Sequence, residues 1–142
     1  MAVVSSIQGT WYNELGSKVI INAVGPLGVF SGEYHTAVET DDDDIPPTPL
    51  VGKTAVTGEN DTFGMTVVWQ GGSSVTSWTG QLHVCGGEET LMTTWILASK
   101  VETCKENWEA YRIGQDYFKR YPIKHDDIHF MRDLARQQKD QK

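Results

Sequence analysis

An amide and a hydroxyl stand four residues apart in residues 9–17, which read GTWYNELGS. Asn13 ends a short run of strand-forming residues, and Ser17 follows the turn after it. Taken alone, both side chains are simplest to interpret as turn residues that hydrogen-bond the local backbone. They could also hold a small polar ligand if other groups completed the site. Asp116 is the charged candidate, because an unpaired carboxylate facing an interior is costly and needs a purpose.

Alternation of apolar and polar residues predicts the elements that would position these groups. In residues 63–69, for example, Phe63, Met65 and Val67 share one face of an extended segment. Turns containing Gly or Pro separate such segments, and the pattern predicts eight strands at about 7–13, 18–24, 29–38, 50–56, 62–70, 74–85, 89–99 and 109–118. The predicted fold is all-β: an eight-stranded antiparallel up-and-down β-barrel with room for one small ligand.

The barrel is predicted to occupy residues 1–118, and residues 119–142 to form a polar C-terminal tail, disordered or in part a short helix. In such a helix His125 and His129 would lie one turn apart. Two histidines without a third ligand predict a solvated face, so no metal site is expected.

The charge of the chain bears on its partners. Its formal net charge of −7 argues against nucleic acid and anionic membranes, which would need a basic surface. No apolar run is long enough to predict a transmembrane helix. The first residues do not resemble a signal peptide, so either the protein is cytosolic or the sequence begins at a mature or trimmed end.

Two cysteines, Cys85 and Cys104, have no CxxC spacing. The first ends the sixth predicted strand and the second follows the seventh, so a whole strand of about 30 Å should separate them. A disulfide tolerates a Cα separation of only about 7 Å, and no intrachain bridge is expected. Free thiols or one intersubunit bridge remain open.

Six segments resemble, in order, the avidin and streptavidin family of biotin-binding proteins. They are GTWYNELGS (9–17), GEYHTAV (32–38), FGMTVVW (63–69), TSWTGQ (76–81), TTWIL (93–97) and WEAYRIGQDYF (108–118). The resemblance covers about residues 7–118. It implies non-catalytic, high-affinity binding of biotin inside the barrel, with no other cofactor. It also implies a secreted, extracellular homotetramer that sequesters free biotin from microbes, and Asn60 begins a glycosylation sequon compatible with secretion.

The resemblance also implies roles for single residues at the biotin head group. Asn13, Ser17 and Tyr34 would donate hydrogen bonds to the ureido oxygen. Thr36 and Asp116 would accept them from the two ureido N–H groups. The other positions that match the family's contacts are Thr76 near the ring sulfur, Trp69, Trp78 and Trp95 as an aromatic box, Leu15, Val38 and Leu97 as apolar walls, and Trp108 closing a neighbouring subunit's pocket.

The biotin carboxylate is where the chain departs from the family pattern. Residues 39–44 read ETDDDD, and this acidic run is expected to oppose capture of an anionic tail. Thr40, Ser74 and backbone N–H groups are the candidates to hold that carboxylate.

Two other functions compete with a biotin site. A lipocalin-like carrier of an apolar ligand shares the Gly-x-Trp of Gly9 and Trp11, but the proposed interior is too polar for it. A barrel hydrolase could use Asp116 as acid or base. It is disfavoured because the predicted strands offer no second inward carboxylate and no inward histidine.

Overall fold

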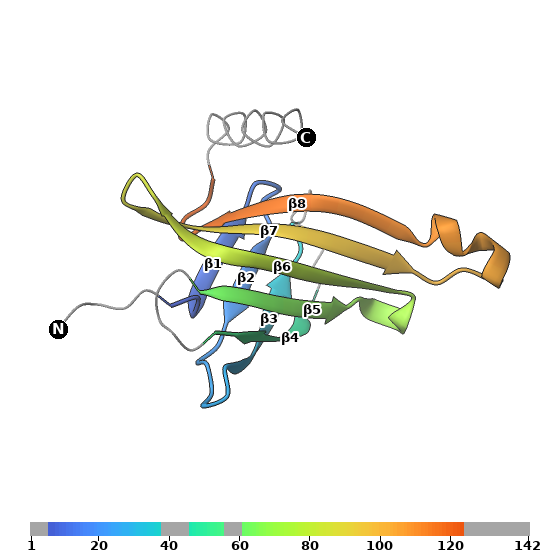
Figure 1. Cartoon of the computed structure of the whole chain (residues 1–142), viewed down its shortest axis with the longest axis horizontal. Helices are drawn as coiled ribbons and strands as arrows, with labels where there is room; N and C mark the ends of the chain where they lie inside the picture. Colours follow the sequence, from blue (N-terminus) through green and yellow to red (C-terminus); the bar gives the residue numbers. More distant parts are fainter. Residues whose placement is uncertain (1–5, 38–45, 56–60, 124–142) are drawn as a thin grey trace.

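Eight antiparallel strands form a closed barrel in which each strand pairs with the next along the chain (Figure 1). The computed structural model describes residues 6–37, 46–55 and 61–123. Its strands are β1 (Gly9–Asn13), β2 (Lys18–Ile21), β3 (Val29–His35), β4 (Thr48–Thr54), β5 (Thr62–Val68), β6 (Ser74–Cys85), β7 (Glu88–Ser99) and β8 (Tyr111–Lys119). Two short 3-10 helices, η1 (Gln70–Gly72) and η2 (Cys104–Glu109), precede β6 and β8. The predicted all-β, eight-stranded barrel is confirmed.

Strand ends differ from the predicted ones by a few residues. β6 has the predicted bounds, whereas β3 ends at His35 and leaves Thr36 and Ala37 exposed beyond it. β4 begins earlier than expected and includes Pro49 as its second residue. A proline, which lacks an N–H donor, is tolerated near the start of a strand. These shifts leave the number and order of the strands unchanged.

Strand register sorts the inward side chains of β6, β7 and β8 into layers. Leu82, Leu91 and Phe118 pair across the three strands and are fully buried. The next layer toward the other end is polar, and it pairs Gly80, Thr93 and Asp116. The two layers after it contain Trp78, Trp95 and Gly114, and then Thr76 and Leu97. An apolar base therefore supports a polar and aromatic upper half.

Gly114 is required for the position of the Trp95 indole. A Cβ atom built on Gly114 would lie 2.2 Å from the Trp95 ring, closer than any real contact. The missing side chain lets the indole lie across β8 inside the barrel.

The base of the barrel is closed by Trp11 and Arg120. Trp11 is fully buried, and its Nε1 donates to the carbonyl oxygen of Ile7 at 2.8 Å. The Arg120 guanidinium carbon lies 3.7 Å from the centre of the Trp11 ring, a cation–π arrangement. Arg120 also donates to the carbonyl oxygens of Gln8 at 2.7 Å and Ser6 at 2.8 Å. Arg120, just beyond the predicted boundary at 118, thus holds the segment that precedes β1.

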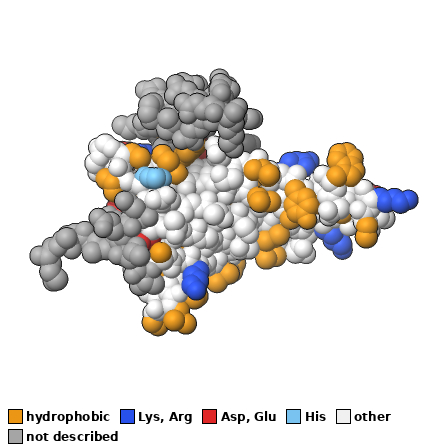
Figure 2. Space-filling model, viewed as in Figure 1, with side chains coloured by type: hydrophobic (Ala, Val, Ile, Leu, Met, Phe, Trp, Pro, Cys, Tyr) orange, Lys and Arg blue, Asp and Glu red, His pale blue; other side chains and the backbone are white. Residues whose placement is uncertain are grey.

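The outer face of β7 and β8 carries exposed apolar side chains. Ile96 and Ile113 are direct cross-strand partners, and Tyr111 lies on the same face of β8. Figure 2 shows hydrophobic side chains gathered at the end of the molecule where β7, β8 and η2 lie. Exposed apolar side chains gathered on one face are typical of interaction surfaces.

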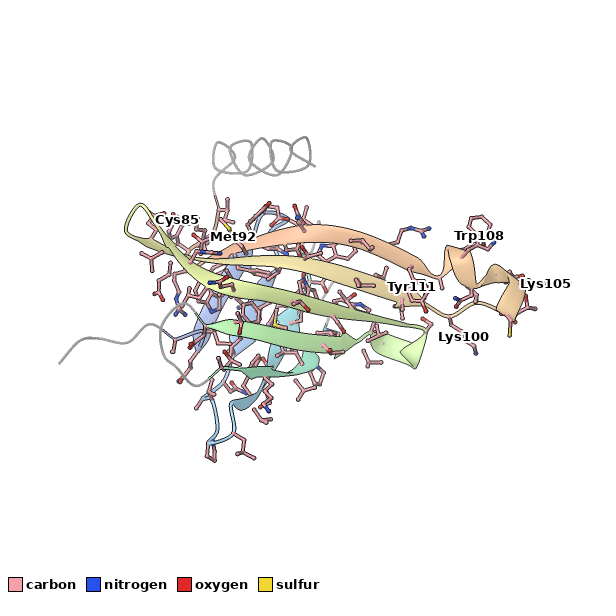
Figure 3. The ribbon with its side chains drawn as sticks, viewed as in Figure 1. Cys85, Met92, Lys100, Lys105, Trp108 and Tyr111 are labelled. Carbon is pink, nitrogen blue, oxygen red and sulfur yellow. The ribbon has the colours of Figure 1, made fainter. Side chains whose placement is uncertain are left out.

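Both cysteines are exposed, and no disulfide joins them within the chain. Cys85 lies at one end of the long strands, and η2, which begins with Cys104, lies at the other (Figure 3). In the described ranges no helix is long and apolar enough to cross a membrane. Those ranges also contain no cluster of three or more His, Cys, Asp or Glu residues suited to a metal. His125 and His129 lie outside them.

Candidate ligand-binding site

The side-chain oxygen of Asn13 bonds the β1–β2 turn, and its side-chain nitrogen bonds a residue inside the barrel. Its Oδ1 accepts hydrogen bonds from the backbone N–H groups of Leu15 at 3.0 Å and Ser17 at 2.9 Å. Its Nδ2 donates to the Tyr34 hydroxyl at 3.3 Å. The turn interpretation is therefore correct for the carbonyl oxygen, while the amide nitrogen is directed to the interior.

Tyr34 and Ser17 add two hydroxyls at the same place. The Ser17 Oγ accepts from the backbone N–H of Ala37 at 3.2 Å. Burial raises the pKa of Tyr34, although a hydrogen bond from Ser17 acts in the opposite direction. The phenol therefore stays protonated at neutral pH. Asn13, Ser17 and Tyr34 thus gather three buried donors in one region of the barrel.

Aromatic rings wall this region. The Tyr34 and Trp78 rings are stacked, with centroids 5.2 Å apart and an interplanar angle of 22°. Trp69 meets Tyr34 edge-on at 5.3 Å and Trp78 at 6.4 Å. The Trp69 Nε1 donates to the Thr76 hydroxyl at 2.8 Å, which fixes the indole. The three rings form a preorganised apolar surface beside the donors.

Asp116 is buried and held from two sides. Its Oδ2 accepts from the Trp78 Nε1 at 2.9 Å, and its backbone oxygen accepts from the Thr93 hydroxyl at 2.8 Å. Thr93 is buried on β7 opposite Asp116, and the sequence gives no sign that it supports the site. Its partner is a backbone atom, which residue types do not reveal.

Glu14 places a second carboxyl group beside Asp116. Its Oε2 accepts from the backbone N–H of Tyr117 at 3.0 Å. Burial, and next the charge of Asp116, raise the pKa of Glu14 to about 8, and a hydrogen bond to Asp116 adds to this. Glu14 is therefore protonated at neutral pH. The expectation of no second inward carboxylate concerned the strands alone, and Glu14 lies outside them, in the β1–β2 turn.

The remaining predicted contact residues lie toward the open end or outside the described ranges. Leu15 is 63% exposed on its turn, and Thr36 is exposed beyond β3. Ser74, Trp95 and Leu97 are half-buried. Val38, Thr40 and the acidic run at 39–44 are not among the described residues.

Trp108 lies apart from the site of its own chain. It stands on η2, is 78% exposed and lies beyond the ends of β7 and β8 (Figure 3). Its position leaves the indole free to contact another molecule.

The arrangement suits a flat, neutral polar group. The three protein donors can all bond one acceptor oxygen of a ligand, and the Asp116 carboxylate can accept from N–H groups beside that oxygen. The aromatic rings can cover the flat faces of the ligand. The polar groups that converge here do not suit a purely apolar ligand.

Comparison with known proteins gives consistent relatives. The family model described as "Avidin family" matches residues 1–121. Avidin of Gallus gallus is 40% identical over 118 residues, covering 81% of this chain and 78% of avidin. Fibropellin-3 of Strongylocentrotus purpuratus is 39% identical over 115 residues, but the matched region covers only 20% of that longer protein. The X-ray structure of a biotin binding protein from chicken superimposes with a TM-score of 0.74 at 39% identity, covering 84% of this chain and 99% of that one.

Proposed function

The chain belongs to the avidin family, and we propose that it binds biotin in the barrel interior, with high affinity and without catalysis. The observation that carries this proposal is the gathering of the buried donors Asn13, Ser17 and Tyr34 in the same interior as the buried Asp116 carboxylate. This set is complementary to a cyclic urea.

The ureido group of biotin has one acceptor oxygen and two N–H donors. Donors from Asn13, Ser17 and Tyr34 would polarise the ureido carbonyl, and such bonds gain strength in a dry pocket. Polarisation makes the ring N–H groups better donors, which favours a carboxylate partner at Asp116. Each end of the ligand dipole then faces protein groups of the opposite sign.

The aromatic box would cover the bicyclic ring. Trp69 and Trp78 already stand at fixed angles with Tyr34, and Trp95 is seated by Gly114. A ligand entering this space would therefore find its walls in place, which lowers the entropic cost of binding. Thr36 would accept a hydrogen bond from the second ureido N–H, and Leu15, Val38 and Leu97 would form apolar walls. Ser74 and Thr40 would meet the carboxylate of the valeryl tail.

Biotin should change the tryptophan fluorescence of the protein at one ligand per chain. Quenching with a blue shift is expected, because the ligand would exclude water from Trp69, Trp78 and Trp95. Titration at micromolar biotin measures this, with valeric acid, which keeps the carboxylate tail but lacks the ring system, as the control ligand. An unchanged spectrum with biotin would reject the proposed function.

A homotetramer is the second part of the proposal. Ile96, Tyr111 and Ile113 are about half or more exposed on the outer face of β7 and β8, and a second copy would cover them. Family resemblance adds Trp108 as the residue that closes the pocket of a neighbouring subunit. Its 78% exposure supports this assignment.

Trp108→Lys is expected to weaken both assembly and biotin retention. A lysine in an apolar interface would bury a charge without a partner. Light scattering coupled to size exclusion should show four times the 15.8 kDa of one chain for the wild type and smaller species for the variant. The matched control is Leu27→Lys, because Leu27 is equally exposed, at 76%, in the β2–β3 connection. A wild-type monomer, or equal effects of the two substitutions, would contradict the tetramer.

The biological role follows from the proposed activity. A secreted, extracellular protein that binds biotin without consuming it would withhold the vitamin from microbes. The membership of the chain in the avidin family supports this role.

A further inference from the structure

Glu14 connects the β1–β2 turn to β8 across the junction that closes the barrel. Its Oε2 accepts from the Tyr117 N–H at 3.0 Å, which places the carboxyl at the residue next to Asp116 on β8, where the charge of Asp116 acts on it. The turn itself does not need the Glu14 side chain, because the side-chain oxygen Oδ1 of Asn13 already accepts from the N–H groups of Leu15 and Ser17. The half-buried carboxyl is thus directed at β8, at the cost of lost solvation.

We propose that Glu14 is a positioning residue, which shares a proton with Asp116 and so fixes the carboxylate that accepts the ring N–H of the ligand. This role rests on the proposed function. Without its proton, Glu14 no longer donates to Asp116 and instead repels it. The acceptor then loses its fixed orientation, and the ligand leaves faster.

Among the described residues, three other titratable groups interact with Glu14, and none of these three competes for this change of charge. Asp116 on β8 is the anionic partner. Tyr117 on β8 and Tyr34 on β3 have pKa values raised above the usual value for tyrosine, in both cases mainly by burial. Both phenols therefore keep their protons at moderately alkaline pH. Glu14, with a pKa of about 8, changes charge between pH 6.5 and 9.5.

Dissociation of labelled biotin at pH 6.5 and 9.5 tests this role. Glu14→Gln retains a donor for Asp116 and an acceptor for the Tyr117 N–H at every pH, whereas Glu14→Ala has neither. At pH 6.5 Glu14→Gln should release biotin at the wild-type rate, and Glu14→Ala about tenfold faster, the value of one hydrogen bond to a charged group. At pH 9.5 the wild type should approach the rate of Glu14→Ala, while Glu14→Gln should not change. Glu33→Gln, on the exposed outer face of β3, is the control for general effects of alkaline pH.

A ligand-free measurement separates the carboxyl pair from biotin binding. The pKa of Glu14 is higher in the folded protein than in the unfolded chain, so its contribution to stability is present at low pH and is lost as pH rises through about 8. The melting temperature of the wild type relative to Glu14→Gln should therefore fall between about pH 4.5 and 8 and then level off.

The outcomes distinguish the two proposals. If the wild type binds biotin but its dissociation rate depends on pH in the same way as that of Glu14→Gln, the role of Glu14 alone is overturned. Slower dissociation from the wild type at pH 9.5 than at pH 6.5 would overturn it too. Absence of biotin binding at both pH values would overturn the proposed function, and this role with it.

Discussion

Replacing Asp116 with alanine is expected to weaken biotin binding by about 100- to 1,000-fold, the combined value of a lost hydrogen bond to a charged group and a buried N–H left unpaired. The unpaired group is the Trp78 Nε1, which donates to Asp116 at 2.9 Å. The fold should survive, because the Thr93 hydroxyl bonds the backbone oxygen of residue 116, not its side chain. Calorimetry with biotin gives the affinity, and circular dichroism checks the fold.

Asp116→Asn is the matched control for this substitution. The amide keeps an acceptor oxygen of similar shape but removes the negative charge, so a loss of roughly tenfold is expected. If alanine at this position left the affinity within about threefold of wild type, Asp116 would not be the acceptor of the ligand N–H.

Trp11→Ala should destabilise the folded protein by about 3–5 kcal/mol, the usual cost of removing a buried tryptophan. The indole is fully buried, bonds the carbonyl oxygen of Ile7 and supports the Arg120 guanidinium. Its removal would leave a cavity at the base of the barrel, one buried acceptor without its donor and a cation without its ring. Denaturant unfolding at a fixed protein concentration, without biotin, measures the effect.

Trp11→Phe should cost less, about 1–2 kcal/mol, because it keeps a ring beneath Arg120 and mainly loses the N–H donor. Arg120→Ala should cost less in the Trp11→Ala background than alone, because the cation–π contact is already lost there and only the bonds to the carbonyl oxygens of Gln8 and Ser6 remain to be removed. A loss of stability below about 1 kcal/mol for Trp11→Ala would show that the base of the barrel does not depend on the contact between Trp11 and Arg120.

Sequence periodicity predicted the barrel because alternation is strictly enforced where one face is buried. In β6 and β7 every second residue must enter the core, and the predicted ends of these strands lie within one residue of the observed ones. At the strand ends near the open end of the barrel, side chains are exposed on both faces, so burial does not enforce the alternation there. β3 accordingly stops at His35, short of the predicted residue 38, and Thr36 is exposed.

The candidate site was predictable where its residues lie on strands. Tyr34, Trp78 and Asp116 are buried on the inward faces that alternation assigns to them. Glu14 was missed because period-two patterns assign no direction to a turn side chain. Only the fold brings this turn against β8, where the carboxyl finds Asp116 and the Tyr117 N–H.

The junction between β1 and β8 has a consequence for how the protein folds. Its strand pairs, Tyr12 with Lys119 and Asn13 with Phe118, join positions more than 100 residues apart. Such contacts slow folding and cannot form until nearly the whole barrel sequence has been synthesised. Asn13 and Glu14 lie on one side of this junction and Asp116 on the other, so the pocket is completed only when β1 pairs with β8 and the barrel closes. A ligand that contacts residues on both sides of this junction binds only the closed barrel. Its binding is therefore thermodynamically linked to the final step of folding.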